Sequence, residues 1–498
     1  MAEAAAVVCE QLTYFYEGEE RPALKGVSLT IPEGEWIAVL GASGSGKSTL
    51  CQLLNGHLPR SGGGRREGAL LLAGMDPAEA PLAEVTACAG VLFQDPDAQL
   101  VRGTVEDEAA FGPENMCVPP AEIERRIAAS LAAVGLSDRR RDPVRSLSGG
   151  QRQRTAIAAV LALEPRLFVF DDACQGLDAA AQAHFLQLCA ALQAEGRTVV
   201  TASGRFDDAA RAAQRVIVLD GGTVVLDGPP EELLRRRGGE LAQQGLLPLP
   251  AGEAAIRAAA PPPGPGALPL LAVKSLDFTY PGGRQALRGV DFALRRGEWA
   301  LLTGANGSGK TTLSRLLMGL LPVPKGRIRW QGKDIAGEPV YRMAENIGYV
   351  FQQPEHMFTA PTVWEELIYS LHGGLPAKRR PELKPAQKRR ADELLESAGL
   401  VRRKDDSPYL LSRGERRLLA VISQLVVPKD LYILDEPTSG MDYAAIGRLV
   451  VMCREACRQG SAILVITHDP ELFYEEASLC LNLDEGKMTA VFLGEQPL

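Results

Sequence analysis

Two glycine-rich loops in the sequence combine the residue types that bind nucleotide phosphates. They read GASGSGKS from Gly41 to Ser48 and GANGSGKT from Gly304 to Thr311, and each follows an apolar run that predicts a buried strand. Glycines let successive backbone N–H groups turn toward one centre at the start of a helix. The lysine then reaches the β- and γ-phosphates, and the final hydroxyl ligates Mg²⁺. The predicted contacts are Gly41, Ser43, Gly44, Gly46, Lys47, Ser48 and Thr49 in the first loop, and Gly304, Asn306, Gly307, Gly309, Lys310, Thr311 and Thr312 in the second.

Two apolar runs end in a pair of acids, an arrangement that can hold a metal ion and activate water. The first run reads FVFDD and ends at Asp172, and the second reads YILDE and ends at Glu436. The first acid of each pair, Asp171 or Asp435, is predicted to hold Mg²⁺ through water. Glu436 is predicted to polarise the water that attacks the γ-phosphate. The sequence therefore predicts ATP and Mg²⁺ as cofactors.

The motifs recur in the same order in the two halves of the chain, so the repeat is a whole domain. Apolar strands alternate with helices, which predicts an α/β fold with a mainly parallel sheet covered on both faces. The Pro-rich stretch APPPGPGALP between the halves is typical of an extended linker. The predicted boundaries are a first domain at 1–240, a linker at 241–269 and a second domain at 270–498.

The composition is that of an ordinary globular protein, with 46% hydrophobic and 23% charged residues in a chain of 498. The net charge of -8 argues against nucleic acid as a partner, because binding to a phosphate backbone needs a dominant basic surface. The N-terminus lacks the pattern of a signal peptide, and no apolar run approaches the ~18 residues that span a bilayer. We therefore expect an intracellular protein that could still dock on a membrane protein.

The stretch LSGGQRQR, from Leu147 to Arg154, is where the chain resembles a known family, the ABC-type ATPases. The resemblance covers almost the whole chain apart from the linker and part of the region between Asp207 and Gln244. It implies an antiparallel β subdomain and a helical subdomain beside each parallel core. It also implies that the two domains pair head to tail, with each ATP between the phosphate loop of one domain and the signature of the other. The signature residues implied to contact ATP are Ser148, Gly149, Gly150 and Gln151 in the first half, and Ser412 and Gly414 in the second.

Further elements of this family map onto single residues. Tyr16 and Tyr280 resemble the aromatics that stack on adenine, although either could instead be a packed strand tyrosine. Gln94 and Gln352 resemble the loop glutamines that contact the metal, and His468 in VITHD resembles the histidine that contacts the γ-phosphate. The implied catalytic residues are Glu436, His468 and Gln352, and the implied metal ligands are Ser48, Gln94, Asp171, Thr311, Gln352 and Asp435.

Departures from the family pattern gather in one of the two composite sites that head-to-tail pairing implies. Asp172 replaces the catalytic glutamate, Ala202 in VVTAS replaces the histidine, and Arg413 in LSRGE replaces a glycine. All three fall in the site built on Lys47, whereas the site built on Lys310 keeps every element. A withdrawal of ~1 Å can cost on the order of 10²-fold in a positioned reaction. The hypothesis is that the first site binds MgATP but hydrolyses it slowly, against the alternative of neutral drift.

The segments after the two loop glutamines resemble one branch of the family. FQDPDAQLVRGTVEDEAAFGPEN follows from Phe93 and FQQPEHMFTAPTVWEELIYSL follows from Phe351. Both are similar to the ATPases of energy-coupling-factor (ECF) importers of vitamins and transition metals. The resemblance implies a membrane coupling subunit and a substrate-binding membrane subunit as partners, at the cytoplasmic face of the membrane.

Two alternatives stay open at this point. A fused sugar-importer ATPase has a similar length, but we expect its second phosphate loop to be degraded, and GANGSGKT is intact. A soluble ABC-F translation factor would carry a long charged helical linker, and APPPGPGALP is neither charged nor helical.

Overall fold

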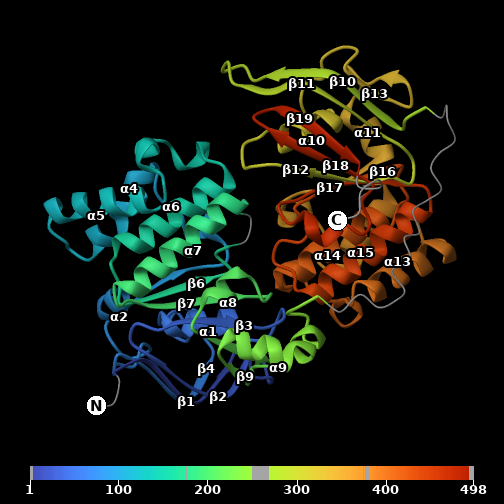
Figure 1. Ribbon diagram of the computed structural model, residues 1–498. Coiled ribbons are helices and arrows are strands. Elements are labelled where there is room, and N and C mark those ends of the chain that lie inside the picture. The colour runs from blue at the N-terminus through green and yellow to red at the C-terminus, as the bar shows by residue number, and fades with distance from the viewer. Residues whose placement is uncertain (1–3, 175–176, 249–267, 374, 376–380, 493–498) are drawn as a thin grey trace. The chain divides into compact units, whose positions relative to one another are not determined.

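The computed structural model describes residues 4–174, 177–248, 268–373, 375 and 381–492 (Figure 1). It divides into two compact units, Met1–Pro250 and Ala251–Leu498. The predicted linker at 241–269 lies mostly outside the described residues, and the predicted boundaries stay predictions. Helix α9, Pro230–Gln243, continues a few residues into the stretch expected to be linker.

The first unit is built on a sheet in the order β5-β6-β7-β3-β8-β9. Neighbouring strands from β5 to β8 pair in parallel, and β9 adds to the edge in the antiparallel sense. A smaller antiparallel sheet has the order β2-β1-β4. The strands of the large sheet are β3 Trp36–Leu40, β5 Ala89–Leu92, β6 Leu167–Asp171, β7 Thr198–Ser203, β8 Arg215–Asp220 and β9 Thr223–Gly228, and those of the small sheet are β1 Ala5–Phe15, β2 Leu24–Pro32 and β4 Arg65–Leu72.

Helices cover both faces of the first unit's large sheet, which follows from strands that are apolar on both faces. In β3, Trp36 and Ala38 pack into one core cluster while Ile37 and Val39 pack into the other. Figure 1 shows α4, α5 and α6 grouped on the side of this unit away from the small sheet. The helices are α1 Lys47–Leu54, α2 Leu82–Cys88, α3 Pro96–Gln99, α4 Val105–Asn115, α5 Pro120–Ala133, α6 Gly149–Ala162, α7 Ala179–Ala194 and α8 Asp208–Ala212, besides α9.

The second unit repeats this arrangement. Its large sheet has the order β15-β16-β17-β12-β18-β19, with β19 antiparallel at the edge, and its small sheet has the order β11-β10-β13-β14. The large sheet consists of β12 Trp299–Thr303, β15 Ile347–Val350, β16 Leu431–Asp435, β17 Ala462–Ile466, β18 Leu479–Asp484 and β19 Lys487–Phe492, the small one of β10 Leu271–Thr279, β11 Gln285–Leu294, β13 Ile328–Trp330 and β14 Lys333–Asp334. The helices are α10 Lys310–Leu317, α11 Val340–Asn346, α12 Val363–Tyr369, α13 Pro385–Ser397, α14 Arg413–Leu425 and α15 Tyr443–Arg458.

The predicted fold class is confirmed: each half has a mainly parallel sheet, a small antiparallel sheet and a helical part. The carboxyl ends of parallel strands meet at one edge of the sheet, where ligands of such folds bind. In the second unit β12 leads into the phosphate loop and β16 ends in the acid pair, so both predicted motifs lie at that edge. The same holds for β3 and β6 in the first unit.

Candidate functional site

Both phosphate loops join a buried strand to the first turn of a helix, as predicted. α1 begins at Lys47 and α10 begins at Lys310, and the glycine before each lysine has a left-handed backbone, with φ of 103° at Gly46 and 114° at Gly309. A Cβ on Gly46 would lie 2.7 Å from the Ala23 carbonyl oxygen, and one on Gly309 would lie 2.6 Å from that of Ala286. Glycine is therefore required at both positions by conformation and by space.

The two lysines adopt one conformation in both loops. Lys47 Nζ donates to the carbonyl oxygens of Gly41 at 2.6 Å and Ala42 at 3.0 Å, and Lys310 Nζ donates to those of Gly304 at 2.6 Å and Ala305 at 3.0 Å. Both side chains are buried. Each ammonium group is thus held inside its own loop, at the helix N-terminus where an anion is favoured. The two loops therefore hold their lysines in the same way.

The predicted tyrosines lie next to the phosphate-loop helices. The hydroxyl of Tyr16 is 3.0 Å from Thr49 Oγ1, and that of Tyr280 is 3.1 Å from Thr312 Oγ1. Tyr16 is also one of the exposed large side chains of the first unit. Each contact joins the residue that follows a strand of the small sheet, β1 or β10, to the helix that carries the lysine.

The acid pairs share an unusual backbone geometry. Asp172 and Glu436, the residues directly after β6 and β16, have φ of 55° and 50°, a region that few side chains enter. Each donates its amide N–H at 2.9 Å to the neighbouring strand, Asp172 to the Ala202 carbonyl oxygen and Glu436 to that of Ile466. The same turn therefore presents the second acid in both halves.

In the second unit a histidine reaches the acid from the next strand. His468 Nε2 lies 3.3 Å from Glu436 Oε1 and 3.1 Å from Asn306 Oδ1 of the phosphate loop, and the His468 amide N–H donates to Glu436 Oε2 at 3.4 Å. Burial, together with the negative charge of Asp435, raises the pKa of Glu436 to about 8. A carboxylate with a pKa near the working pH suits a general base.

The first unit has no histidine at this place. The prediction that Ala202 takes the place of the histidine was wrong. The strand ladder pairs Asp171 with Ala202 and Asp435 with Ile466, so Ala202 is the counterpart of Ile466. Gly204, two residues further on, occupies the position of His468. The prediction that the histidine is missing holds, because glycine has no side chain to offer. Ala202 itself is a buried strand residue.

The first unit's acid has a different partner. Gln94 Nε2 donates to Asp172 Oδ2 at 2.8 Å, so the loop glutamine is hydrogen-bonded to the second acid. In the second unit the backbone carbonyl of Gln352 is held instead, by Arg417.

The first acid of each pair also has different surroundings in the two halves. Tyr349 donates its hydroxyl to Asp435 Oδ2 at 3.1 Å and lies 2.9 Å from Ser314 Oγ of α10, and all three residues are buried. Burial raises the pKa of Asp435. The corresponding residues of the first unit, Val91 and Cys51, carry no hydroxyl. Sequence reasoning missed Tyr349, although a comparison of buried positions between the halves would have found it.

Both signatures begin a helix with a capping box. Ser148 Oγ accepts from the Gln151 amide at 3.4 Å while Gln151 Oε1 accepts from the Ser148 amide at 3.0 Å. Ser412 and Glu415 make the same reciprocal pair at 3.3 and 2.8 Å before α14. The signature thus fixes the start of a helix and satisfies two backbone donors. A helix N-terminus favours a negative charge.

Among the buried positions at which the signature helices differ, the one that holds Arg417 was also missed from the sequence. Arg417 on α14 donates to the carbonyl oxygens of Glu436 and Gln352, and burial and the charge of Arg413 lower its pKa to about 10. Its counterpart on α6 is Gln153, whose amide donates to the Ala173 carbonyl oxygen.

The motif after each loop glutamine has a structural basis. Glu108 and Glu366 are buried, and one oxygen of each accepts two backbone N–H groups of the preceding loop. For Glu108 the donors are Val101 at 3.0 Å and Arg102 at 2.6 Å; for Glu366 they are Thr359 at 2.7 Å and Ala360 at 2.8 Å. The threonine of the motif caps the following helix in both halves.

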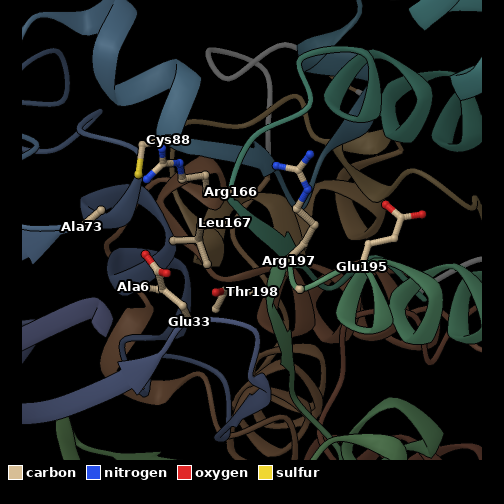
Figure 2. Close-up of a pocket in the computed structure, with 10 residues that line it drawn as sticks. Ala6, Glu33, Ala73, Cys88, Arg166, Leu167, Glu195, Arg197 and Thr198 are labelled. Carbon is tan, nitrogen blue, oxygen red and sulfur yellow. The ribbon is translucent and has the colours of Figure 1, made fainter. Parts of the chain in front are cut away.

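A cavity of about 300 Å³ lies elsewhere in the first unit (Figure 2). Leu167 and Thr198 in its wall are the first residues of β6 and β7, so it lies at the sheet edge opposite the phosphate loop. At the corresponding place of the second unit, Arg296 forms a two-pronged ion pair with Asp430 at 2.6 and 2.9 Å. The cavity is not part of the nucleotide site.

Comparison with known proteins identifies the family. A sequence profile described as ABC transporter matches residues 24–175 and 287–439, together more than half of the chain. The chain belongs to the ABC transporter family. It is an ABC transporter ATPase with two ATP-binding domains, which confirms the predicted resemblance and activity.

Relatives of this ABC transporter ATPase match it over nearly its whole length. A putative ABC transporter ATP-binding protein of Methanosarcina acetivorans is 33% identical over 524 residues, covering 96% of this chain and 84% of the relative. The putative HMP/thiamine import ATP-binding protein YkoD of Bacillus subtilis is 33% identical over 505 residues, covering 96% and 89%. A solved structure of cbiO1 from Clostridium perfringens, described as part of the transporter complex cbiONQ, is 32% identical and covers 49% of this chain and 96% of that one, with a TM-score of 0.43.

Within the described part of this ABC transporter ATPase, no helix combines the length and apolar character needed to cross a bilayer.

Proposed function

We propose that this ATPase energises an ECF-type importer of a vitamin, a vitamin precursor or a transition-metal ion. The observation that carries the proposal is the motif after the loop glutamine, present in both halves with its buried glutamate. The similarity to YkoD, whose name describes HMP/thiamine import, supports the same class of transporter.

The loops held by Glu108 and Glu366 are the proposed docking surfaces for a transmembrane coupling subunit. Val101, in the loop held by Glu108, is 63% exposed, and the Arg102 guanidinium lies 4.4 Å from the ring centre of Phe111. A loop fixed from inside by a buried carboxylate presents its outer side chains in one arrangement, which lowers the entropy cost of binding. The chain would then lie at the cytoplasmic face of the membrane, together with a substrate-binding membrane subunit.

The two halves are proposed to pair head to tail and to form two composite ATP sites. Lys310, Thr311, Asp435, Glu436 and His468, with the signature from Ser148 to Gln151, would form the hydrolytic site. The other site, built on Lys47, Ser48 and Asp171 with Ser412 and Gly414, would bind ATP and hydrolyse it slowly. Asp172 and Gly204 support this assignment, because the first is a shorter acid and the second offers no imidazole.

The residues at each sheet edge fit Mg²⁺ as the metal. Hydroxyl, carboxylate and amide oxygens are hard ligands of the kind that Mg²⁺ prefers. They would come from Ser48, Asp171 and Gln94 at one site and from Thr311, Asp435 and Gln352 at the other. Asp435 and Glu436 are both buried, so a cation beside them would stabilise their charged forms. When bound, the metal neutralises charge between the β- and γ-phosphates.

Co-purification tests the proposed transport role. The tagged full-length chain is recovered from detergent-solubilised membranes of its own cell, and its partners are identified by mass spectrometry. We expect two different membrane proteins in stoichiometric amounts. Recovery with ribosomes and without membrane proteins would refute the importer, and recovery with a sugar permease would refute the ECF class.

A pair of variants makes the test specific to the docking loops. Glu366→Gln removes the charge that holds the Thr359 and Ala360 amides, and should reduce recovery of the membrane partners several-fold. Glu365→Gln, on the same helix, should leave recovery unchanged. Equal recovery with the two variants would show that the loop held by Glu366 is not a docking surface.

A further inference from the structure

Arg417 connects the signature helix of the second unit to both of its catalytic loops. The residue lies one turn beyond Arg413 on α14 and is 4% exposed. Its Nη1 donates to the Glu436 carbonyl oxygen at 2.7 Å and its Nη2 donates to the Gln352 carbonyl oxygen at 2.8 Å. One side chain therefore joins α14, the segment after β15 and the segment after β16.

The planar guanidinium makes this connection stiff. Its two donors are fixed relative to one another, so a shift of α14 must displace both carbonyl groups or break charge-assisted hydrogen bonds in a buried place. Gln153, the counterpart in the first unit, offers a single amide nitrogen, which donates to the Ala173 carbonyl oxygen. This pair of hydrogen bonds from one guanidinium, here called the Arg417 fork, has no equivalent at Gln153 among the described residues of the first unit.

The inference about Arg417 rests on the proposed function and on its two composite ATP sites. In head-to-tail pairing the start of α14, with Ser412 and Gly414, faces the ATP held by Lys47. Gln352 and Glu436 act instead on the ATP held by Lys310. The Arg417 fork therefore runs from the signature of the slow site to the catalytic residues of the hydrolytic site.

We propose that Arg417 is a positioning residue that couples the two ATP sites. ATP in the slow site binds one placement of the α14 N-terminus better than the others, and the fork transmits that placement to Gln352 and Glu436. A ligand shifts a conformational equilibrium only through such a difference in affinity. The ATP that is not hydrolysed would thereby prepare the other site for hydrolysis.

A double-mutant cycle on the purified full-length chain tests the coupling. Lys47→Ala removes the phosphate-binding lysine of the slow site, and Arg417→Gln gives the second unit the residue found in the first. We expect Lys47→Ala to lower kcat by a factor within the range of about 5 to 150 typical of coupled sites. In the Arg417→Gln background the same substitution should change kcat less than twofold. An equal factor in the two backgrounds would overturn the coupling through Arg417.

Arg390→Gln is the matched control. Arg390 lies on α13, and its Nη2 donates at 3.4 Å to the carbonyl oxygen of Leu425, the last residue of α14. In the Arg390→Gln background the full effect of Lys47→Ala should persist. If Arg417→Gln melts below the assay temperature, Arg417→Lys replaces it, because lysine keeps the charge but lacks the rigid planar guanidinium that fixes the two donors relative to one another.

Hydrogen exchange gives a readout independent of turnover. In a Lys310→Ala chain the non-hydrolysable analogue AMP-PNP is restricted to the slow site. We expect it to protect backbone amides around Gln352 and Glu436, and to lose this effect when Arg417→Gln is added. Failure of the Lys310→Ala chain to bind AMP-PNP would refute the proposed slow site itself. Binding without protection in either chain would refute only the coupling.

Discussion

Asp172 and Glu436 share one backbone geometry and differ in their side-chain partners. Both have a left-handed φ, and both donate their amide N–H to the adjacent strand at 2.9 Å. The Glu436 carboxylate meets His468, whereas the Asp172 carboxylate accepts from Gln94. The two halves therefore share the backbone turn but differ in the acid that it carries and in the side chain that contacts this acid.

Substituting each acid by its amide separates their roles. Glu436→Gln should lower ATPase activity about 10² to 10⁴-fold, the range attributed to a general base, and Asp172→Asn should leave most of it. Single-turnover hydrolysis with equal nucleotide loading is the measurement. The opposite ranking would contradict the assignment of the hydrolytic site.

The histidine position offers a second test, with a control supplied by the other half. His468→Ala removes the imidazole that lies between Glu436 and Asn306 and should lower kcat on the order of 10²-fold. Gly204→Ala should have little effect, because a Cβ there has the Gly41 carbonyl oxygen as its nearest neighbour at 4.0 Å. A comparable loss in both variants would mean that the two positions are equally important.

The sequence was sufficient for the parts of the site that lie on one continuous stretch. The phosphate loops, the strand-terminal acids and the signatures are each local, and the structure has each in the expected strand, turn or helix. The register of β7 depends on its pairing with β6, which is a separate stretch of the chain. The likeness of VVTAS to VITHD favours Ala202 as the counterpart of His468, whereas the ladder from Asp171 to Ala202 identifies Gly204. The spacing of 264 residues between Asp171 and Asp435 leads from His468 to the same glycine.

The supporting contacts could not be read from the sequence for the same reason. Tyr349 reaches Asp435, 86 residues further along the chain, and Arg417 reaches Gln352, 65 residues earlier. Tyr349 lies outside the predicted motifs, and Arg417 lies in the second signature stretch at the place that Gln153 has in LSGGQRQR. Both stand where the two halves differ at a buried position, so a comparison of the halves finds them only after the core is known.

The pKa of Glu436 predicts a pH-dependent stability. Burial raises the pKa in the folded chain to about 8, above the ordinary value of 4.5. Between these pH values the folded state binds more protons than the unfolded state, so the free energy of unfolding falls as pH rises. Glu436→Gln removes this penalty and should stabilise the nucleotide-free second unit on the order of a few kcal/mol at pH 8, since one pKa unit is about 1.4 kcal/mol.

Thermal unfolding at pH 5 and pH 8 measures this effect. The melting temperature of Glu436→Gln should exceed that of the parent chain by several degrees at pH 8, and the difference should shrink at pH 5. Glu396→Gln, an exposed position on α13, serves as the control and should show no such trend. A constant difference across pH would mean that Glu436 does not titrate in this range.

The hydroxyl of Tyr349 supplies the last prediction. Tyr349→Phe keeps the ring but leaves Asp435 Oδ2 without its 3.1 Å donor, in a buried place where a lost hydrogen bond costs about 1–3 kcal/mol. A less firmly held carboxylate should bind the metal less well, so the Mg²⁺ concentration for half-maximal ATPase activity should rise several-fold. Tyr432→Phe is the control. The buried Tyr432 hydroxyl accepts from the Lys429 amide at 3.0 Å, near the start of β16 and away from the acids at the end of that strand. We expect both variants to lower the melting temperature and only Tyr349→Phe to shift the Mg²⁺ dependence, whereas an equal shift in both would show that Tyr349 acts through stability alone.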